Sequence, residues 1–134
     1  MSEAGGQLSL TIAAVPGQVQ VARAFVAKVL GESHPDAGVA VLLASELAAN
    51  SVLHSGSAVP GGVVTVTVAV SGSGVRVEVT DRSGVGVPVL APAACADGEA
   101  EGSRGMRLVD MLAARWGYCR GGGFTTTWFE LSYY

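Results

Sequence analysis

The sequence predicts a two-layer α/β sandwich, a mixed β-sheet with three main helices packed on one face. Apolar residues alternate with polar ones in some segments, as in strands, and recur at three- and four-residue spacing in others, as in helices. The order of these segments is strand, two helices, two strands, helix and two strands, which fits such a sandwich. At 134 residues the chain suits one domain. We expect residues 1–134 to form it, with 1–7 as a flexible N-terminus.

The first half of the chain predicts one strand and two helices. Leu8, Leu10 and Ile12 alternate with small or polar residues, as expected of a half-buried strand. Apolar residues then recur at helical spacing over residues 16–31 and again over residues 37–54. A helix is expected in each of these two segments.

The second half predicts a hairpin, a long connection, a helix and two strands. Segments 63–70 and 75–80 are rich in β-branched residues and are separated by Ser-Gly-Ser-Gly, so they should pair antiparallel. Residues 82–104 lack a periodic pattern, and a connection of this length is usually functional or mobile. The remaining elements are, in order, a helix over 106–113 and strands near 116–120 and 125–132.

Composition and charge exclude several classes of protein. The formal net charge is −3 and the eight basic residues are dispersed, so no basic stripe could neutralise a nucleic-acid backbone. The N-terminus lacks a basic region and the apolar stretch near 63–70 contains threonines, so neither a signal peptide nor a membrane span is predicted. Cys95 and Cys119 lack zinc-type or CxxC spacing, which indicates neither a metal site nor a disulfide framework. A reduced, cytoplasmic protein is expected.

Two polar residues interrupt the apolar helix predicted over 37–54. Glu46 and Asn50 stand four residues apart and therefore share a face. A buried carboxylate costs free energy unless it is hydrogen-bonded or bound to a cation, and a wet nucleotide pocket with a divalent ion would supply both. Alternatively, both side chains simply face solvent. Zinc bound with His54 is disfavoured, because asparagine is a poor zinc ligand and no thiolate is near in sequence.

Asp81 directly follows a predicted strand and precedes glycines, including Gly86. Glycines allow the backbone to approach a ligand closely, and a carboxylate at this point could accept a hydrogen bond from an amino group. The alternative is an ordinary turn, since aspartate and glycine commonly follow strands.

Two further segments could contact phosphate groups. Gly102-Ser-Arg-Gly105 precedes the predicted third main helix, so free backbone amides could hold phosphate oxygens, although helices also begin near glycine for conformational reasons alone. The spacing matches neither a P-loop nor a GxGxxG motif. Threonines 125, 126 and 127 offer hydroxyl donors on the last strand, although β-propensity alone would also explain them.

Three segments together resemble one known superfamily. They are Glu46-Leu-Ala-Ala-Asn50-Ser-Val-Leu-His54, Gly105-Met-Arg-Leu-Val-Asp110 and Trp128-Phe-Glu-Leu131. In this order they resemble the Bergerat-fold ATPases, and most closely the small bacterial ATP-binding proteins related to anti-sigma-factor serine kinases. The resemblance spans nearly the whole chain from the first strand to the last. One departure is that the usual Asp-x-Gly-x-Gly becomes Asp81-Arg-Ser-Gly-Val-Gly86, with an additional residue before the glycine pair.

The resemblance implies ATP and Mg²⁺ as ligands. It makes Glu46 the general base, Asn50 the ligand of Mg²⁺ and Asp81 the acceptor for the adenine amino group, with Gly86 giving the base room. Residues 87–104 would form the ATP lid. The other implied nucleotide contacts come from Gly102, Arg104, Gly105, Met106 and Thr126.

The same resemblance implies a function. We expect a protein serine/threonine kinase that transfers the γ-phosphate of ATP to an anti-sigma antagonist and thereby controls a sigma factor. The alternative is a nucleotide-sensing module that binds ATP and a regulator without transferring phosphate. Anti-sigma kinases commonly pair, so a homodimer formed through the first helix or first strand is also possible.

Overall fold

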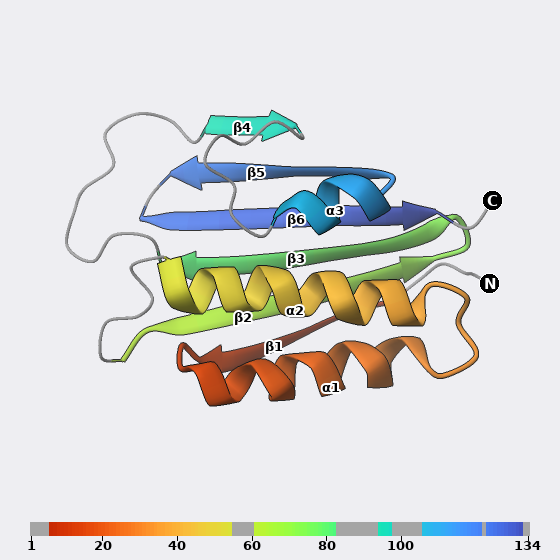
Figure 1. Cartoon of the computed structure of the whole chain (residues 1–134), viewed down its shortest axis with the longest axis horizontal. Coiled ribbons are helices and arrows are strands. Elements are labelled where there is room, and N and C mark those ends of the chain that lie inside the picture. The colour runs from red at the N-terminus through yellow and green to blue at the C-terminus, as the bar shows by residue number, and fades with distance from the viewer. Residues whose placement is uncertain (1–5, 55–60, 83–93, 98–105, 122, 133–134) are drawn as a thin grey trace.

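A computed structural model describes residues 6–54, 61–82, 94–97, 106–121 and 123–132. The elements in chain order are β1 (Gln7–Ala13), the 3₁₀ helix η1 (Pro16–Gln18), α1 (Val19–Leu30), α2 (Ala37–His54), β2 (Val63–Ser71), β3 (Gly74–Arg82), β4 (Ala94–Asp97), α3 (Met106–Leu112), β5 (Arg115–Gly121) and β6 (Phe124–Ser132) (Figure 1).

The strands of the described residues form one six-stranded sheet in the order β1-β2-β3-β6-β5-β4. Every neighbouring pair is antiparallel, so the expected mixed pairing is wrong, whereas the α/β sandwich class is confirmed. The physical reason is the position of the last strand. β3 and β5 run in the same direction and would be parallel neighbours, but β6 returns from β5 through a hairpin and lies between them (Figure 1).

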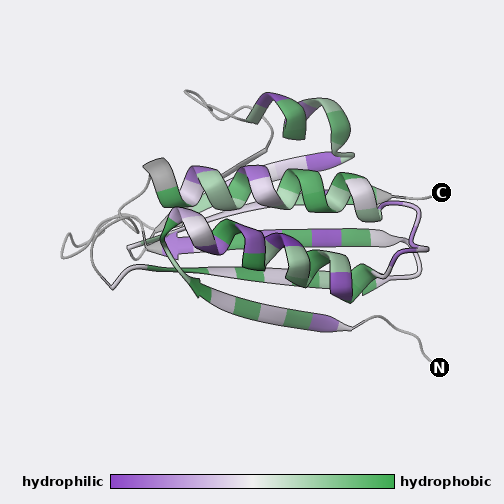
Figure 2. Ribbon diagram, turned by 60° about the horizontal axis from the view of Figure 1, so that its bottom comes forward, coloured by the Kyte–Doolittle hydropathy of each residue, from purple (hydrophilic) through white to green (hydrophobic). Residues whose placement is uncertain are grey.

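The helices α1, α2 and α3 lie on one face of the sheet, which gives the molecule two layers (Figures 1 and 2). Side chains along each strand point alternately toward the helices and toward the open face of the sheet, and the alternating colours of Figure 2 follow this pattern. In β3, Val75, Val77 and Val79 are buried against the helices, and the residues between them are half-buried on the open face. The largest fully buried side chains are Phe129, Leu43, Leu47, Val26, Val64, Val66, Val68, Val77, Val79 and Val109.

Local sequence accounts for the bounds of the first helices. Pro16 begins the 3₁₀ turn that leads into α1, because its fixed φ suits a first helical turn. α1 ends at Gly31, which has a φ of 85° that would be strained for any residue with a side chain. The N–H of Gly31 donates to the carbonyl of Ala27 at 2.9 Å. α2 spans Ala37–His54, as predicted.

The long connection after β3 contains a strand that the sequence did not predict. β4 pairs with β5 at the edge of the sheet, and Cys95 in β4 is the Cα partner of Cys119 in β5. Cys119 is disulfide-bonded, so the expected reduced state is wrong in this structure. The two cysteines are distant in sequence and come together only through the register of β4 with β5, which no spacing motif reveals.

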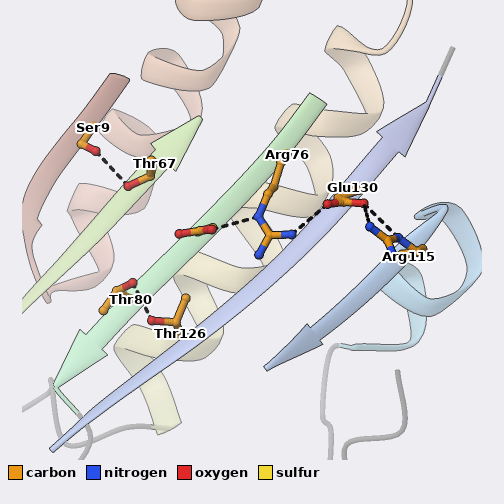
Figure 3. Close-up of polar contacts among 8 residues, drawn as sticks. Ser9, Thr67, Arg76, Thr80, Arg115, Thr126 and Glu130 are labelled. Atoms are coloured by element: carbon orange, nitrogen blue, oxygen red, sulfur yellow. Dashed lines mark hydrogen bonds and ion pairs between the residues drawn. The ribbon is translucent and has the colours of Figure 1, made fainter. Parts of the chain in front are cut away.

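The open face of the sheet is polar. Hydroxyl pairs bridge neighbouring strands at 2.8–2.9 Å between Ser9 and Thr67, Thr11 and Thr65, and Thr80 and Thr126; Figure 3 shows the first and the last. Such cross-strand hydroxyl pairs stabilise the sheet modestly.

A chain of ion pairs crosses this open face (Figure 3). Glu130 accepts hydrogen bonds from Arg76 Nη1 at 2.8 Å and Arg115 Nη2 at 2.6 Å, and Arg76 Nε donates to Glu78 at 2.9 Å. The Arg76 guanidinium also lies 4.2 Å from the centre of the Trp128 ring. Burial would raise the pKa of Glu130, but hydrogen bonds from Arg115 and Arg76 outweigh it, so this pKa lies below its ordinary value of 4.5.

Glu130→Gln should therefore destabilise the protein in a pH-dependent way. Because the folded-state pKa of Glu130 is lowered, its contribution is present at neutral pH and is lost as the pH falls through that pKa. We expect the free energy of unfolding to fall by up to about 1 kcal/mol at pH 7, with the difference vanishing well below pH 4.5. Urea unfolding across this pH range measures it. Glu78→Gln, which breaks a bond to one arginine only, is the control and should cost less. Equal losses at pH 7 and pH 3 would contradict this account.

Candidate functional site

The helix α2 presents Glu46 and Asn50 at the border of its buried face. Leu43 and Leu47 are buried against the sheet, whereas Glu46 and Asn50 are half-buried. Helical spacing places these two polar side chains one turn apart on the same side of α2. Both side chains therefore keep partial access to solvent, as a residue that contacts a ligand in a wet pocket or one that simply faces solvent would.

Asp81 lies in β3 with its side chain on the face that the helices cover. It continues the alternation of Val77 and Val79, and it is 6% exposed. Its Cα partner in β2 is Val64, which is fully buried. Because a carboxylate in such surroundings costs free energy unless polar groups compensate, this position favours a specific role over an ordinary exposed turn.

Ser51 is a second buried polar residue on this side of the sheet. Among the described residues, the buried polar or charged side chains are those of Ser51 and Asp81, and Ser51 is 7% exposed. Ser51 is not among the site residues that the sequence predicts. One feature of the sequence could have indicated Ser51. It lies four residues after Leu47 and therefore on the apolar face of α2, where a hydroxyl needs a polar neighbour or ligand.

The C-terminal ends of α2 and β3 lie at the same end of the molecule (Figure 1), and the two elements are in contact. This arrangement brings Asn50 and Asp81 to one end of the domain, with Glu46 one turn further along α2. Met106, the first residue of α3, is buried at 5% exposure, and α3 contacts α2. The ends of α2, β3 and α3 thus frame the candidate site.

Thr126 lies on the opposite face of the sheet from Asp81. Its Oγ1 is 2.9 Å from Thr80 Oγ1 on the open face (Figure 3). Asp81 is instead the Cα partner of Thr125, and directly paired residues share a face. Thr127 also shares that face, because strand residues alternate. The structure therefore separates Thr126 from the candidate site and makes Thr125 and Thr127 the hydroxyl candidates.

Several predicted site residues lie outside the described part of the chain. These are Gly86, Gly102, Arg104 and Gly105, together with most of the expected lid over 87–104. The side chain of His54 is likewise outside it. β4 is the described portion of that expected lid.

A magnesium ion carried by a nucleotide needs fewer protein ligands than one held by a cage of side chains. Among the described side chains, no group of three or more His, Cys, Asp and Glu residues could hold a metal ion. Mg²⁺ commonly takes one or two protein oxygens and completes its shell with phosphate oxygens and water. The half-buried Glu46 and Asn50 can offer oxygens of this kind.

A family model for the histidine kinase-like ATPase domain matches residues 12–131. The chain therefore belongs to the histidine kinase-like ATPase family, and ATP is the ligand that this membership implies. The match includes α2, β3, α3 and all of β6 except its last residue, and hence every described residue of the candidate site. No curated protein matches the chain. In the described part of the chain, none of the helices has the length and apolar character needed to cross a bilayer.

The two faces of β6 give a direct test of the site. We expect Thr125→Val to weaken ATP binding by about two- to tenfold, the usual value of one hydrogen bond, because Thr125 shares the face of Asp81. Thr126→Val should leave ATP affinity unchanged, because its hydroxyl bonds to Thr80 on the open face. Calorimetric titration of both variants with MgATP measures the difference. A larger loss for Thr126→Val would place the nucleotide on the other face.

Proposed function

We propose that the protein is an ATP-dependent serine/threonine kinase of the anti-sigma-factor type. It would transfer the γ-phosphate of ATP to a serine or threonine of an anti-sigma antagonist and so control a sigma factor. The observation that carries this proposal is the placement of half-buried Glu46 and Asn50 beside the end of β3, where Asp81 is buried.

Asp81 would recognise the adenine. A carboxylate buried between apolar strand residues is a strong acceptor for an exocyclic amino group, and it would distinguish adenine from bases that present a carbonyl at that position. Thr125 or Thr127 would add a hydroxyl on the same face. Gly86 would give the base room, in line with the resemblance.

Glu46 and Asn50 would act at the phosphate end of the site. Bound MgATP supplies the phosphoryl group and a cation that offsets its charge. The Asn50 side-chain oxygen would be one ligand of that cation. The Glu46 carboxylate would accept the proton of the attacking serine or threonine hydroxyl, and its half-buried position leaves it accessible to a partner protein. Gly102, Arg104, Gly105 and Met106 complete the proposed contacts.

The alternative is a nucleotide-sensing module without phosphotransfer. The additional residue between Asp81 and Gly86, relative to the usual motif, favours it, because a shifted adenine loop can bind the base without aligning the γ-phosphate. Both functions require a sigma factor or another regulator as partner. A second copy of the chain could pair through β1, which is one of the two edge strands of the described sheet.

Asp81→Asn tests the nucleotide site that both functions need. The substitution keeps the shape of the side chain but removes its charge, so we expect ATP affinity to fall by roughly 10- to 100-fold. Asp36→Asn, just before the opposite end of α2, is the matched control and should bind ATP like the wild type. Calorimetric titration with MgATP, with the thermal unfolding of each variant as a folding check, gives the result. Unchanged affinity in folded Asp81→Asn would overturn the assigned site.

Glu46→Gln separates the kinase from the sensing module. Without the base, transfer of labelled phosphate from ATP to purified anti-sigma antagonists of the same organism should slow by roughly 10²- to 10⁴-fold. ATP affinity should stay within about threefold of the wild type, because the side chain remains polar and of equal size. Glu32→Gln, an exposed residue after α1, is the control. Transfer at the wild-type rate by Glu46→Gln would exclude Glu46 as the base, and no transfer by the wild type would favour the sensing module.

A further inference from the structure

The final-strand segment Trp128-Phe-Glu-Leu131 places two side chains on the open face of the sheet. Phe129 and Leu131 are buried on the helix side, so Trp128 and Glu130, which alternate with them, lie on the opposite side. Asp81 faces the helices, so neither Trp128 nor Glu130 takes part in the candidate site. These two outward residues are therefore free to serve a second site.

Glu130 belongs to a row of residues that crosses the open face from β1 to β5. Cα pairings join β1 to β2, β2 to β3, β3 to β6 and β6 to β5 within this row. Its members are, in strand order, Gln7, Ala69, Arg76, Glu130 and Arg115. The row lies beside the β2–β3 turn, at the end of the sheet opposite to the one where α2 and β3 terminate (Figure 1). No described helix lies on this face (Figures 1 and 2).

A hollow of about 660 Å³ follows this row. All members of the row line it, together with small residues such as Ala114, Ser71 and Ser73. Neighbouring strands lie about 4.8 Å apart, so a row across five strands is roughly 19 Å long. This length accommodates roughly six residues of extended chain, and the volume is typical of ligand sites. The hollow therefore suits an extended peptide better than a single small ion.

Arg76 and Arg115 have hydrogen-bond donors to spare in this hollow. Each guanidinium carries five N–H donors, and its bonds to the described glutamates use two of them (Figure 3). Within the described part of the chain, Glu78 and Glu130 are the acceptors of these two side chains. The side chain of Arg115 is 71% exposed, so its remaining N–H groups can reach a ligand.

Trp128 holds both guanidinium groups close to its ring. The ring centre lies 4.2 Å from the guanidinium carbon of Arg76 and 6.0 Å from that of Arg115. Such cation–π contacts restrict the long arginine side chains, so less conformational entropy is lost when a ligand binds them. The two cations are thus pre-organised beside the hollow.

The charge of the hollow favours a carboxylate over a chain of phosphates. Its lining carries two positive charges, Arg76 and Arg115, and one negative charge, Glu130, which leaves a net charge of +1. Glu78 lies next to the hollow and bonds to Arg76, so a polyanion would meet two carboxylates there. A single carboxylate matches the surplus charge and the planar donor geometry of guanidinium groups.

We propose that this hollow binds an extended acidic segment of a partner protein, in which one glutamate or aspartate carboxylate accepts hydrogen bonds from Arg115 and Arg76. The hollow lies on the other face of the sheet from Asp81 and at the opposite end, so the segment and a nucleotide can be bound together. The proposal does not rest on the proposed function, and a failure of ATP binding would leave it intact.

An NMR titration of the isotope-labelled full chain tests the site. The probe is a six-residue alanine peptide with one central glutamate and with acetylated and amidated ends, at millimolar concentration. We expect shifts of the Arg76 and Arg115 amides and of the Trp128 indole N–H, with the Asp81 amide unchanged. The counterpart peptide with glutamine should bind at least about tenfold more weakly, because it lacks charge-assisted hydrogen bonds. Equal binding of the two peptides, or no shift in this row, would overturn the proposal.

Two further arms sharpen the test. Arg115→Gln should weaken binding of the glutamate peptide at least about fivefold, whereas Arg23→Gln, an exposed residue of α1, should leave it unchanged. Thermal unfolding checks that each variant is folded, and unchanged affinity in folded Arg115→Gln would overturn the site. If Arg115→Gln does not fold, the comparison of the two peptides on the wild type decides. Tighter binding of a six-nucleotide oligothymidylate than of the glutamate peptide would overturn the choice of a protein partner.

Discussion

The packing of α2 against β3 is the contact on which the rest of this structure depends. Leu43 and Leu47 of α2 are buried over a sheet whose inward residues in β3 are Val77 and Val79. Because these apolar side chains set which way each element faces, they also determine that Asp81 points toward the helices. A one-residue slip of β3 would move Asp81 to the open face and leave the site without its buried carboxylate.

Periodicity predicted most of the fold. α2 agrees with its predicted bounds, and the hairpin of β2 and β3 follows from β-branched segments around a glycine turn. Periodicity could not show which strands become neighbours, since pairing is a long-range property. The insertion of β6 between β3 and β5, which makes the sheet antiparallel, is therefore absent from the prediction. β4 was missed because four residues are too short to show alternation.

The candidate site was predictable where its residues interrupt a pattern. Glu46 and Asn50 stand out in an apolar helix, and Asp81 stands out at the end of an apolar strand. To decide which of the three threonines can contact the nucleotide, one must know which residues of β6 point toward the helices. That face could have been read from Phe129 and Leu131, which alternate with polar residues and so place Thr125 and Thr127 inward. Ser51 was not predicted as a site residue, because a single serine in a helix forms no recognisable motif.

The central position of β6 has a consequence for how the chain folds during synthesis. β6 supplies the buried Phe129 and pairs with both β3 and β5, yet it is synthesised after every other described element. Until it emerges, β3 and β5 each present an unpaired edge, and the helices have no complete sheet to cover. The nascent domain therefore cannot fold progressively from its N-terminus. It should collapse in one late cooperative step, and a polypeptide that stops short of Phe129 is a substrate for chaperones and proteases.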